Sequence, residues 1–170
     1  MGKVLEKFIN GPAGTVSREH DYVIVNLRNT GATDIAFGAP VFLNGTTGGV
    51  RNYDSSTDTF DKFVGFAVRV PDKTPETMGT IGSASPWAAA QAGVWKSGDL
   101  VSVLVRGNIV VNAAAGTSLG QPVYIRKSDG VITTNPGADN TTVALTNVFV
   151  RTPRDANSCM EITVTTRNLV

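Results

Sequence analysis

Residues 93–134 read GVWKSGDLVSVLVRGNIVVNAAAGTSLGQPVYIRKSDGVITT, and this stretch decides the fold. Its first apolar run places Val101, Val103 and Val105 at every second position, the pattern of a strand with one buried face. Leu104 stands on the other side of that run, where a polar residue would be expected. The sequence therefore predicts a strand whose second face is also covered, at least in part.

The same stretch carries two turn signals. Gly107-Asn108 tolerates a positive φ and suits a turn or a bulge before the apolar run 109–111. Asp129-Gly130 separates the alternating runs 121–126 and 131–133, and an Asp-Gly pair in that place is a strong short-range hairpin signal. The stretch reads as a β-module, and none of its side chains indicates catalysis.

Length and composition point to one β-domain. A chain of 170 residues can bury about 70% of its unfolded surface as a single domain. Its 18 Gly and 8 Pro favour short strands joined by many turns. We predict an all-β fold, a single small antiparallel barrel or jelly-roll-like sandwich formed by residues 21–170. Residues 1–20 are expected to form an extended N-terminal arm or first strand, and at most one short helix is expected, near 85–92.

Further strands are expected on both sides of the opening stretch. Their apolar patterns place them at 22–28, 39–43, 63–70, 142–151 and 160–166. In 63–70 the alternation predicts Val64, Phe66 and Val68 on one face, with Gly65 leaving room for close approach on the other. In 160–166 it predicts that Glu161 faces outward.

Three glycines share a local pattern. Gly38, Gly98 and Gly120 are each followed by any residue, then Pro or Leu, then Val and a strand. A glycine at such a position is suited to the turn into a strand, and proline fits a strand's first position. The spacing between the three is uneven, so the pattern predicts similar turns in one barrel or sandwich and excludes a solenoid.

Charge and hydropathy exclude several classes of partner. The net charge is +1 and only 17% of the residues are charged, so neither nucleic acid nor an acidic surface is implied. No apolar stretch approaches the length of a membrane span, and the first residues lack the apolar core of a signal peptide. We expect synthesis in a cytosol and no membrane partner.

The residues that could support chemistry are few. His20 lies in a charged segment and is interpreted as a solvated loop residue, and Cys159 lacks a second cysteine for a disulfide or a metal pair. Asp54, Asp58 and Asp61 could supply the carboxylate oxygens of a calcium-binding loop. Their spacing does not match an EF-hand, so a solvated loop is favoured. A distributed carboxylate pair has no specific support among 14 acidic residues. We predict no catalytic, cofactor-binding or metal site, and no enzyme.

Interaction residues are sought instead among exposed cations and aromatics. Arginines 28, 69, 106, 126 and 151 each follow an apolar run, where they could bond carboxylates across an interface or only protect strand edges. Tryptophans 87 and 95 and Tyr53 could pack in the core or form a stacking platform for a sugar. The candidate interface comprises Phe8, Ile9, Arg18, Arg28, Tyr53, Arg69, Trp87 and Arg106.

Four motifs together resemble a known family. They are GFAV at 65–68, KSGDLVSVLVRGNIV at 96–110, LGQPVYI at 119–125 and DGVIT at 129–133. They are similar to the strands and turns of tailed-bacteriophage head decoration proteins, also called capsid cement proteins. The resemblance covers roughly residues 35–135, and its motifs are structural, so no catalytic residue is carried over.

The resemblance implies a function. Such a protein would bind the outside of an assembled icosahedral capsid as a homo-oligomer, a dimer or a trimer, and brace the capsomers formed by the major capsid protein. It would be made in the host cytoplasm and reside on the virion. Removing residues 1–14 would then weaken shell binding without unfolding the β-domain. The alternative is a carbohydrate- or receptor-binding β-sandwich module of a virion or cell surface.

Overall fold

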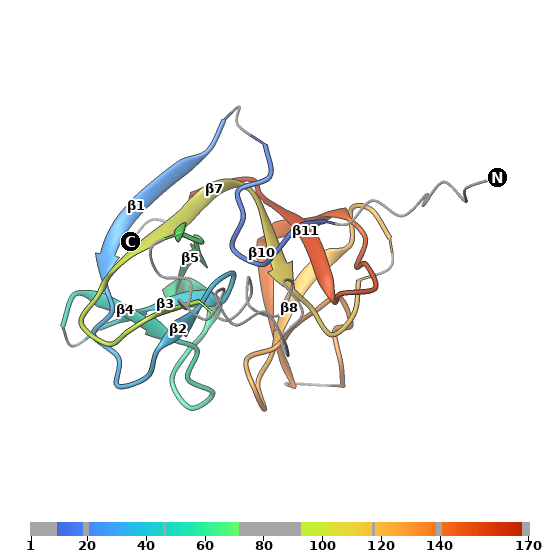
Figure 1. Ribbon diagram of the computed structural model, residues 1–170. Coiled ribbons are helices and arrows are strands. Elements are labelled where there is room, and N and C mark those ends of the chain that lie inside the picture. Colours follow the sequence, from blue (N-terminus) through green and yellow to red (C-terminus); the bar gives the residue numbers. More distant parts are fainter. Residues whose placement is uncertain are drawn as a thin grey trace, which may run out of the picture.

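The computed structural model describes residues 10–18, 21–45, 47–71, 93–116, 118–138 and 141–167, and this part of the chain is almost entirely β (Figure 1). Its strands are β1 (Val23–Arg28), β2 (Ile35–Ala36), β3 (Pro40–Asn44), β4 (Gly49–Asn52), β5 (Phe63–Ala67), β6 (Val94–Trp95), β7 (Leu100–Asn112), β8 (Pro122–Arg126), β9 (Ile132–Thr133), β10 (Thr142–Thr152) and β11 (Cys159–Val164). A 3-10 turn at Phe60–Lys62 precedes β5. The helix expected near 85–92 lies outside the described residues.

One strand joins the two halves of the molecule. The main sheet has the order β4-β3-β5-β7-β11-β10-β8-β9, with β1 also paired to β7 and all neighbours antiparallel. The first half of β7 pairs with β1 and β5, and its residues Gly107–Asn112 pair with β11. Figure 1 shows β7 running from the group of β1, β3, β4 and β5 into the group of β8, β10 and β11. Each half of the fold therefore depends on the same strand.

The first half of β7 is buried on both faces. Val101, Val103 and Val105 pack in a cluster with Ile35, Phe37 and Trp95, which β1 and the small β2-β6 sheet help to cover. Leu104 points the other way, into a second cluster that contains Phe42, Phe66 and side chains of β8, β10 and β11. The prediction that the second face of this strand is covered is confirmed, and Leu104 is fully buried.

Gly107 forms a kink within a strand. The sequence allowed a turn or a bulge here, and the structure has one continuous strand of 13 residues in which Gly107 adopts a φ of 120°. The pairing with β1 shifts register between Val23 and Ile24, opposite Val105 and two residues before Gly107. Irregular pairing beside a glycine lets a strand bend without losing its ladder. The Asp129-Gly130 hairpin is confirmed by the pairing of β8 with β9.

The predicted faces of strand β5 are partly wrong. Phe66 and Val68 share one cluster, whereas Val64 packs in the other cluster. The reason is a register shift in the β3-β5 pairing, which breaks strict alternation along this short strand. The expectation for Gly65 is borne out, because a Cβ at this position would overlap the main-chain carbonyl of Leu104.

The shared turn at the three glycines is also present. Gly38, Gly98 and Gly120 have φ values of 73°, 91° and 74°, in the left-handed region that favours glycine. Each glycine lies two residues before the start of a strand, which begins at Pro40, Leu100 or Pro122. The repeated sequence pattern thus encodes a repeated entry into a strand.

The all-β antiparallel fold is confirmed, and the curled sheet stays open. Strands β1 and β4 approach each other through a bridge between Asn29 and Val50, without a ladder that would close a barrel. The two clusters lie on opposite faces of the layer formed by β3, β5 and the first half of β7. This arrangement corresponds to the sandwich-like form of the prediction.

We predict that Gly65→Ala lowers the free energy of unfolding by about 2 kcal/mol or more, because the added methyl group must displace the backbone of β7. Chemical denaturation followed by circular dichroism measures the change. Gly45→Ala is the matched control, since a Cβ there meets nothing within 4 Å. Equal stability of the two variants would contradict the close approach of β5 and β7.

Candidate interaction surface

Residues 10–18 lie along their own domain. The Asn10 side-chain amide donates to the carbonyls of Pro153 at 2.9 Å and Cys159 at 2.8 Å, and the Asn10 backbone N–H donates to Asp155. Gly14 N–H donates to the carbonyl of Val110 at 2.8 Å, and Ala13 is only 1% exposed. A truncation through residue 14 would therefore remove contacts of the domain itself. A test of the N-terminal segment alone must stop at residue 9.

A buried carboxylate holds the end of this segment. Glu161 on β11 is 5% exposed, and its oxygens accept hydrogen bonds from Ser17 Oγ at 2.6 Å and Thr152 Oγ1 at 2.6 Å. Arg18 adds an ion pair to the same carboxylate, with Nε 2.9 Å from Oε1. The expectation that Glu161 faces solvent is wrong, because residues 17–18 cover the outward side of β11. Alternation along a strand gives no signal of such a distant cover.

The ionisation of Glu161 is governed by opposing effects. Burial disfavours the charged form and would raise the pKa, but hydrogen bonds from Arg18, Ser17 and Thr152 outweigh burial and hold the pKa below its ordinary value of 4.5. The same side-chain hydrogen bond raises the pKa of the Arg18 guanidinium. Glu161 therefore stays ionised at neutral pH and ties the segment to β10 and β11.

The structure scatters the predicted interface residues. Phe8, Ile9 and Trp87 lie outside the described residues. Arg18 pairs with Glu161, and Arg106 pairs with Asp21, which lowers the pKa of that carboxyl through the side-chain hydrogen bond. Both pairs flank the junction of β7 and β11, where a hollow of about 270 Å³ is lined by Asp21, Arg106, Gly107, Asn108 and residues 163–165.

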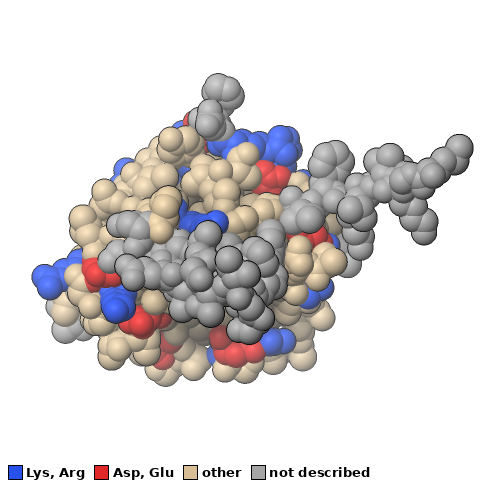
Figure 2. Space-filling model, in the orientation of Figure 1, with Lys and Arg blue, Asp and Glu red and all other residues tan. Residues whose placement is uncertain are grey.

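The other three interface candidates lie elsewhere. Arg28 is exposed at the end of β1, and Arg69 is partly buried with its backbone N–H donating to the carbonyl of Gly14 at 2.8 Å. Tyr53 packs edge-on against Phe42, with ring centroids 5.3 Å apart. Figure 2 shows positive and negative side chains interspersed on the face in view, without a field of one sign. Charge alone therefore marks no single docking site on this face.

Packing within the domain engages two of the aromatic residues considered as a stacking platform for a sugar. Trp95 is 5% exposed, its Nε1 donates to the carbonyl of Val68 at 3.0 Å, and its ring meets Phe37 edge-on. Tyr53 is partly buried, and burial is the main cause of its raised pKa. Both rings are thus engaged in packing within the domain, Trp95 as a buried residue and Tyr53 as a partly buried one.

The acidic loop is organised by internal hydrogen bonds. Asp58 is buried and accepts two bonds from the Arg51 guanidinium, at 2.7 and 2.9 Å. The Asp54 carboxylate accepts from the backbone and hydroxyl of Ser56, and Asp61 accepts from Thr59. Among the described residues, no group of three or more His, Cys, Asp or Glu side chains could hold a metal ion.

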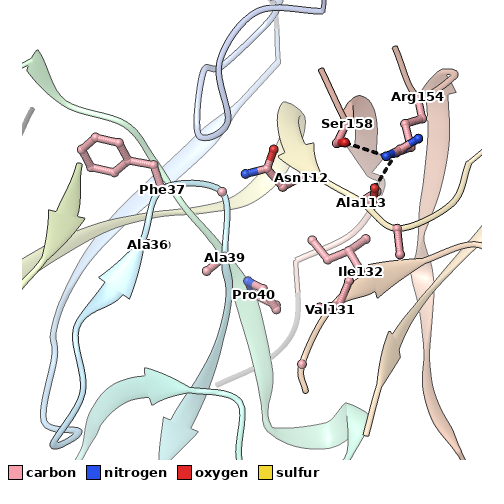
Figure 3. A pocket seen from close by; sticks show the side chains of 13 residues that line it. Ala36, Phe37, Ala39, Pro40, Asn112, Ala113, Val131, Ile132, Arg154 and Ser158 are labelled. Atoms are coloured by element: carbon pink, nitrogen blue, oxygen red, sulfur yellow. Dashed lines mark hydrogen bonds between the residues drawn. The ribbon is translucent and has the colours of Figure 1, made fainter. Parts of the chain in front are cut away.

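An apolar groove of about 400 Å³ opens where the two halves meet (Figure 3). Phe37, Ala39 and Pro40 lie on one side of it, and Ala113, Val131 and Ile132 lie on the other. Arg154 stands at its rim, donating to the carbonyl of Ala113 at 2.7 Å and to the Ser158 hydroxyl. The lining offers apolar contact and no arrangement of a nucleophile with a base. His20 lies outside the described residues.

The comparisons with known proteins agree with this structural character. The family model described as "Structural cement protein (E217 gp24/Pam3 gp6)" matches residues 4–165. The chain belongs to this structural cement protein family. The match is wider than the resemblance seen at 35–135, and membership gives the protein a capsid-associated structural role. No curated protein sequence matches it.

One solved structure has a fold similar to that of this chain. A chain from the capsid of Myoviridae phage XM1 superposes with a TM-score of 0.68 at 20% sequence identity, over 97% of this chain and 96% of that chain. At this identity the similarity shows the fold alone.

In the described part of the chain, no helix has the length and apolar character needed to cross a membrane.

We predict that Glu161→Gln lowers the free energy of unfolding by about 2 kcal/mol at pH 7, because charge-assisted bonds to a buried group are lost. The folded-state pKa of Glu161 lies below 4.5, so its contribution is full above that pH and is lost as pH falls through the folded-state value. The gap between wild type and variant should therefore close in acid. Urea denaturation at several pH values between 7 and 3 measures it.

Asp129→Asn is the control for this experiment. Its pair with Arg126 is solvent-exposed, with side chains 42% and 44% exposed, and such pairs contribute little to stability. A stability difference for Glu161→Gln that stays constant with pH would contradict the role assigned to the carboxylate.

Proposed function

We propose that this protein binds the outer surface of an assembled icosahedral capsid as a homo-oligomer and stabilises the shell by bridging neighbouring capsomers. Its partner is the major capsid protein, and it resides on the virion. The family match over residues 4–165 carries the proposal.

The fold supplies a rigid body suited to that role. The layer of β3, β5 and β7 is packed on both faces, so force applied at one half is transmitted through a continuous, buried sheet. Asn10 is held by three hydrogen bonds, so the chain before it starts from a fixed point on the domain. We propose that residues 1–9, including Phe8 and Ile9, contact a neighbouring subunit from there.

Bridging stabilises a shell by mass action. A protein that binds the assembled lattice more tightly than separate subunits lowers the free energy of the lattice. An oligomer that touches several subunits gains from the high effective concentration of its second contact, so each interface can be modest. No catalytic step is needed for this function.

The glycan- or receptor-binding alternative has less support. Of its three proposed platform residues, Trp95 is buried and hydrogen-bonded and Tyr53 packs against Phe42. Trp87 lies outside the described residues. A saturable signal on a glycan array that disappears with Trp87→Ala would favour this alternative.

We predict that deleting residues 2–9 reduces retention on purified capsids at least tenfold, while the thermal unfolding midpoint of the isolated protein stays within about 2 °C. The contacts of Asn10, Ala13 and Gly14 with the domain remain in this variant. Co-sedimentation with capsids stripped of the protein measures retention, and scanning calorimetry of wild-type-loaded shells measures stabilisation.

Asn10→Ala in the full chain is the matched control. It removes the side-chain hydrogen bonds to Pro153 and Cys159 and leaves residues 1–9 in the chain. Comparing it with the deletion therefore separates the effect of anchoring these residues from the effect of their own contacts with the capsid. Unchanged retention of the deletion variant would contradict the role of residues 1–9. Absence of any wild-type binding to shells, or equal binding to unassembled capsomers, would contradict bridging itself.

A further inference from the structure

Asn10 fixes the N-terminal segment through its side-chain amide. The amide nitrogen donates to the carbonyls of Pro153 and Cys159, and the backbone N–H of Asn10 donates to Asp155 Oδ2 at 3.0 Å. A carboxamide has two N–H donors on its nitrogen, whereas a carboxylate has none. The oxygens that surround position 10 therefore fit an amide and oppose a carboxylate.

A glycine in open space follows this amide. Gly11 has a φ of 84°, and a Cβ at this position would meet nothing within 4 Å. Within the described part of the chain, the Gly11 N–H donates no hydrogen bond. A glycine leaves its backbone nitrogen unshielded, so this nitrogen can reach the side-chain carbon of the preceding asparagine. Asn10-Gly11 thus combines an amide that the fold requires with the neighbour that most readily displaces it.

We propose that Asn10-Gly11 is a deamidation site, and that deamidation and docking of Asn10 exclude each other. The Gly11 nitrogen bonds to Asn10 Cγ, its proton passes through solvent to Nδ2, and the Cγ–Nδ2 bond breaks to release ammonia. Water then adds across one of the two C–N bonds of the cyclic imide, which gives aspartate or isoaspartate. No atom is oxidised or reduced, and water is the only co-reactant.

Docking opposes ring closure, because the donors that hold Asn10 leave with the ammonia. The cyclic imide has no side-chain N–H, so the carbonyls of Pro153 and Cys159 would each lose a donor. Residue 10 must therefore open locally before the ring can form. The reaction is confined to chains in which Asn10 has left its place on the domain.

The product cannot return to that place. Aspartate would direct charged oxygens at the carbonyls of Pro153 and Cys159, close to the Asp155 carboxylate that accepts from the backbone N–H. Isoaspartate also lengthens the main chain by a methylene group, which shifts the residues before it. Deamidation thereby makes a reversible opening of the N-terminal segment permanent.

The consequence for a shell rests on the proposed function, in which residues 1–9 contact a neighbouring subunit. A chain that loses the Asn10 amide before it binds presents these residues from an unfixed start, so their ordering costs more free energy on binding. The chemistry and the docking are measured on the isolated protein. Their failure would leave capsid binding untouched, and a failure of capsid binding would leave them untouched.

The second Asn-Gly pair of the sequence, Asn44-Gly45, is an internal reference for the reaction. The Asn44 amide donates to the Thr30 carbonyl at 3.3 Å and to the Thr30 hydroxyl at 3.2 Å, and no described hydrogen bond joins it to residues 10–14. The ratio of Asn10 loss to Asn44 loss in the same molecules therefore corrects for pH, temperature and global unfolding.

Peptide mass spectrometry of protein kept in mildly alkaline heavy-oxygen water measures this ratio, because each product takes up oxygen from water. We expect the ratio to rise about tenfold in Asp155→Ala, which removes the acceptor of the Asn10 backbone N–H. Both sites should react in chains unfolded by urea. An unchanged ratio in Asp155→Ala, or no reaction at Asn10 in the unfolded chain, would overturn the proposal.

Amide hydrogen exchange tests the product. In Asn10→Asp the backbone N–H of residue 10 should exchange about tenfold faster than in wild type, while the Gly14 N–H, which donates to Val110, stays protected. Asn44→Asp is the matched control and should leave the N–H of residue 10 as protected as in wild type. Wild-type protection of residue 10 in Asn10→Asp would show that a carboxylate docks there, and would overturn the proposal.

Discussion

The backbone hydrogen bonds of β7 are the interaction on which the rest of the structure depends. This strand pairs with β1 and β5 in its first half and with β11 in its second half, and residues 14–17 bond to it as well. Because almost all backbone N–H and C=O groups of β7 are hydrogen-bonded, both faces of the strand can be buried at little cost in free energy. Gly107 lies between the halves with a φ of 120°. Two hydrophobic clusters share this ladder because alternate side chains of the first half face opposite ways, Leu104 into one cluster and Val101 and Val103 into the other.

Much of this fold could be predicted from local sequence patterns. Alternating valines located the first half of β7, the Asp-Gly pair located the β8-β9 hairpin, and Leu104 revealed the second buried face. These features have a period or a turn that is set by neighbouring residues. The faces of β5 could not be predicted in this way, because they depend on a register shift against β3.

The polar contacts were the least accessible to sequence reasoning. Glu161 lies in an alternating strand and was expected to be solvated, but residues far away in the sequence bury it and supply its partners. Arg18 and Arg106 were selected as candidate interface residues, and each forms an ion pair within the domain. Such pairs depend on tertiary proximity, and a single sequence carries no periodic signal for them.

The anchor at Asn10 has a consequence for how the protein is made. Its partners lie about 145 positions further along the chain, in the loop before β11 and in β11 itself. Contacts between such distant residues slow folding, because a long loop must close before they form. The N-terminal segment therefore cannot dock until the last strand has left the ribosome. During synthesis the segment stays available to the chaperones and neighbouring chains of the cell, and the finished domain is the first state in which its position is set.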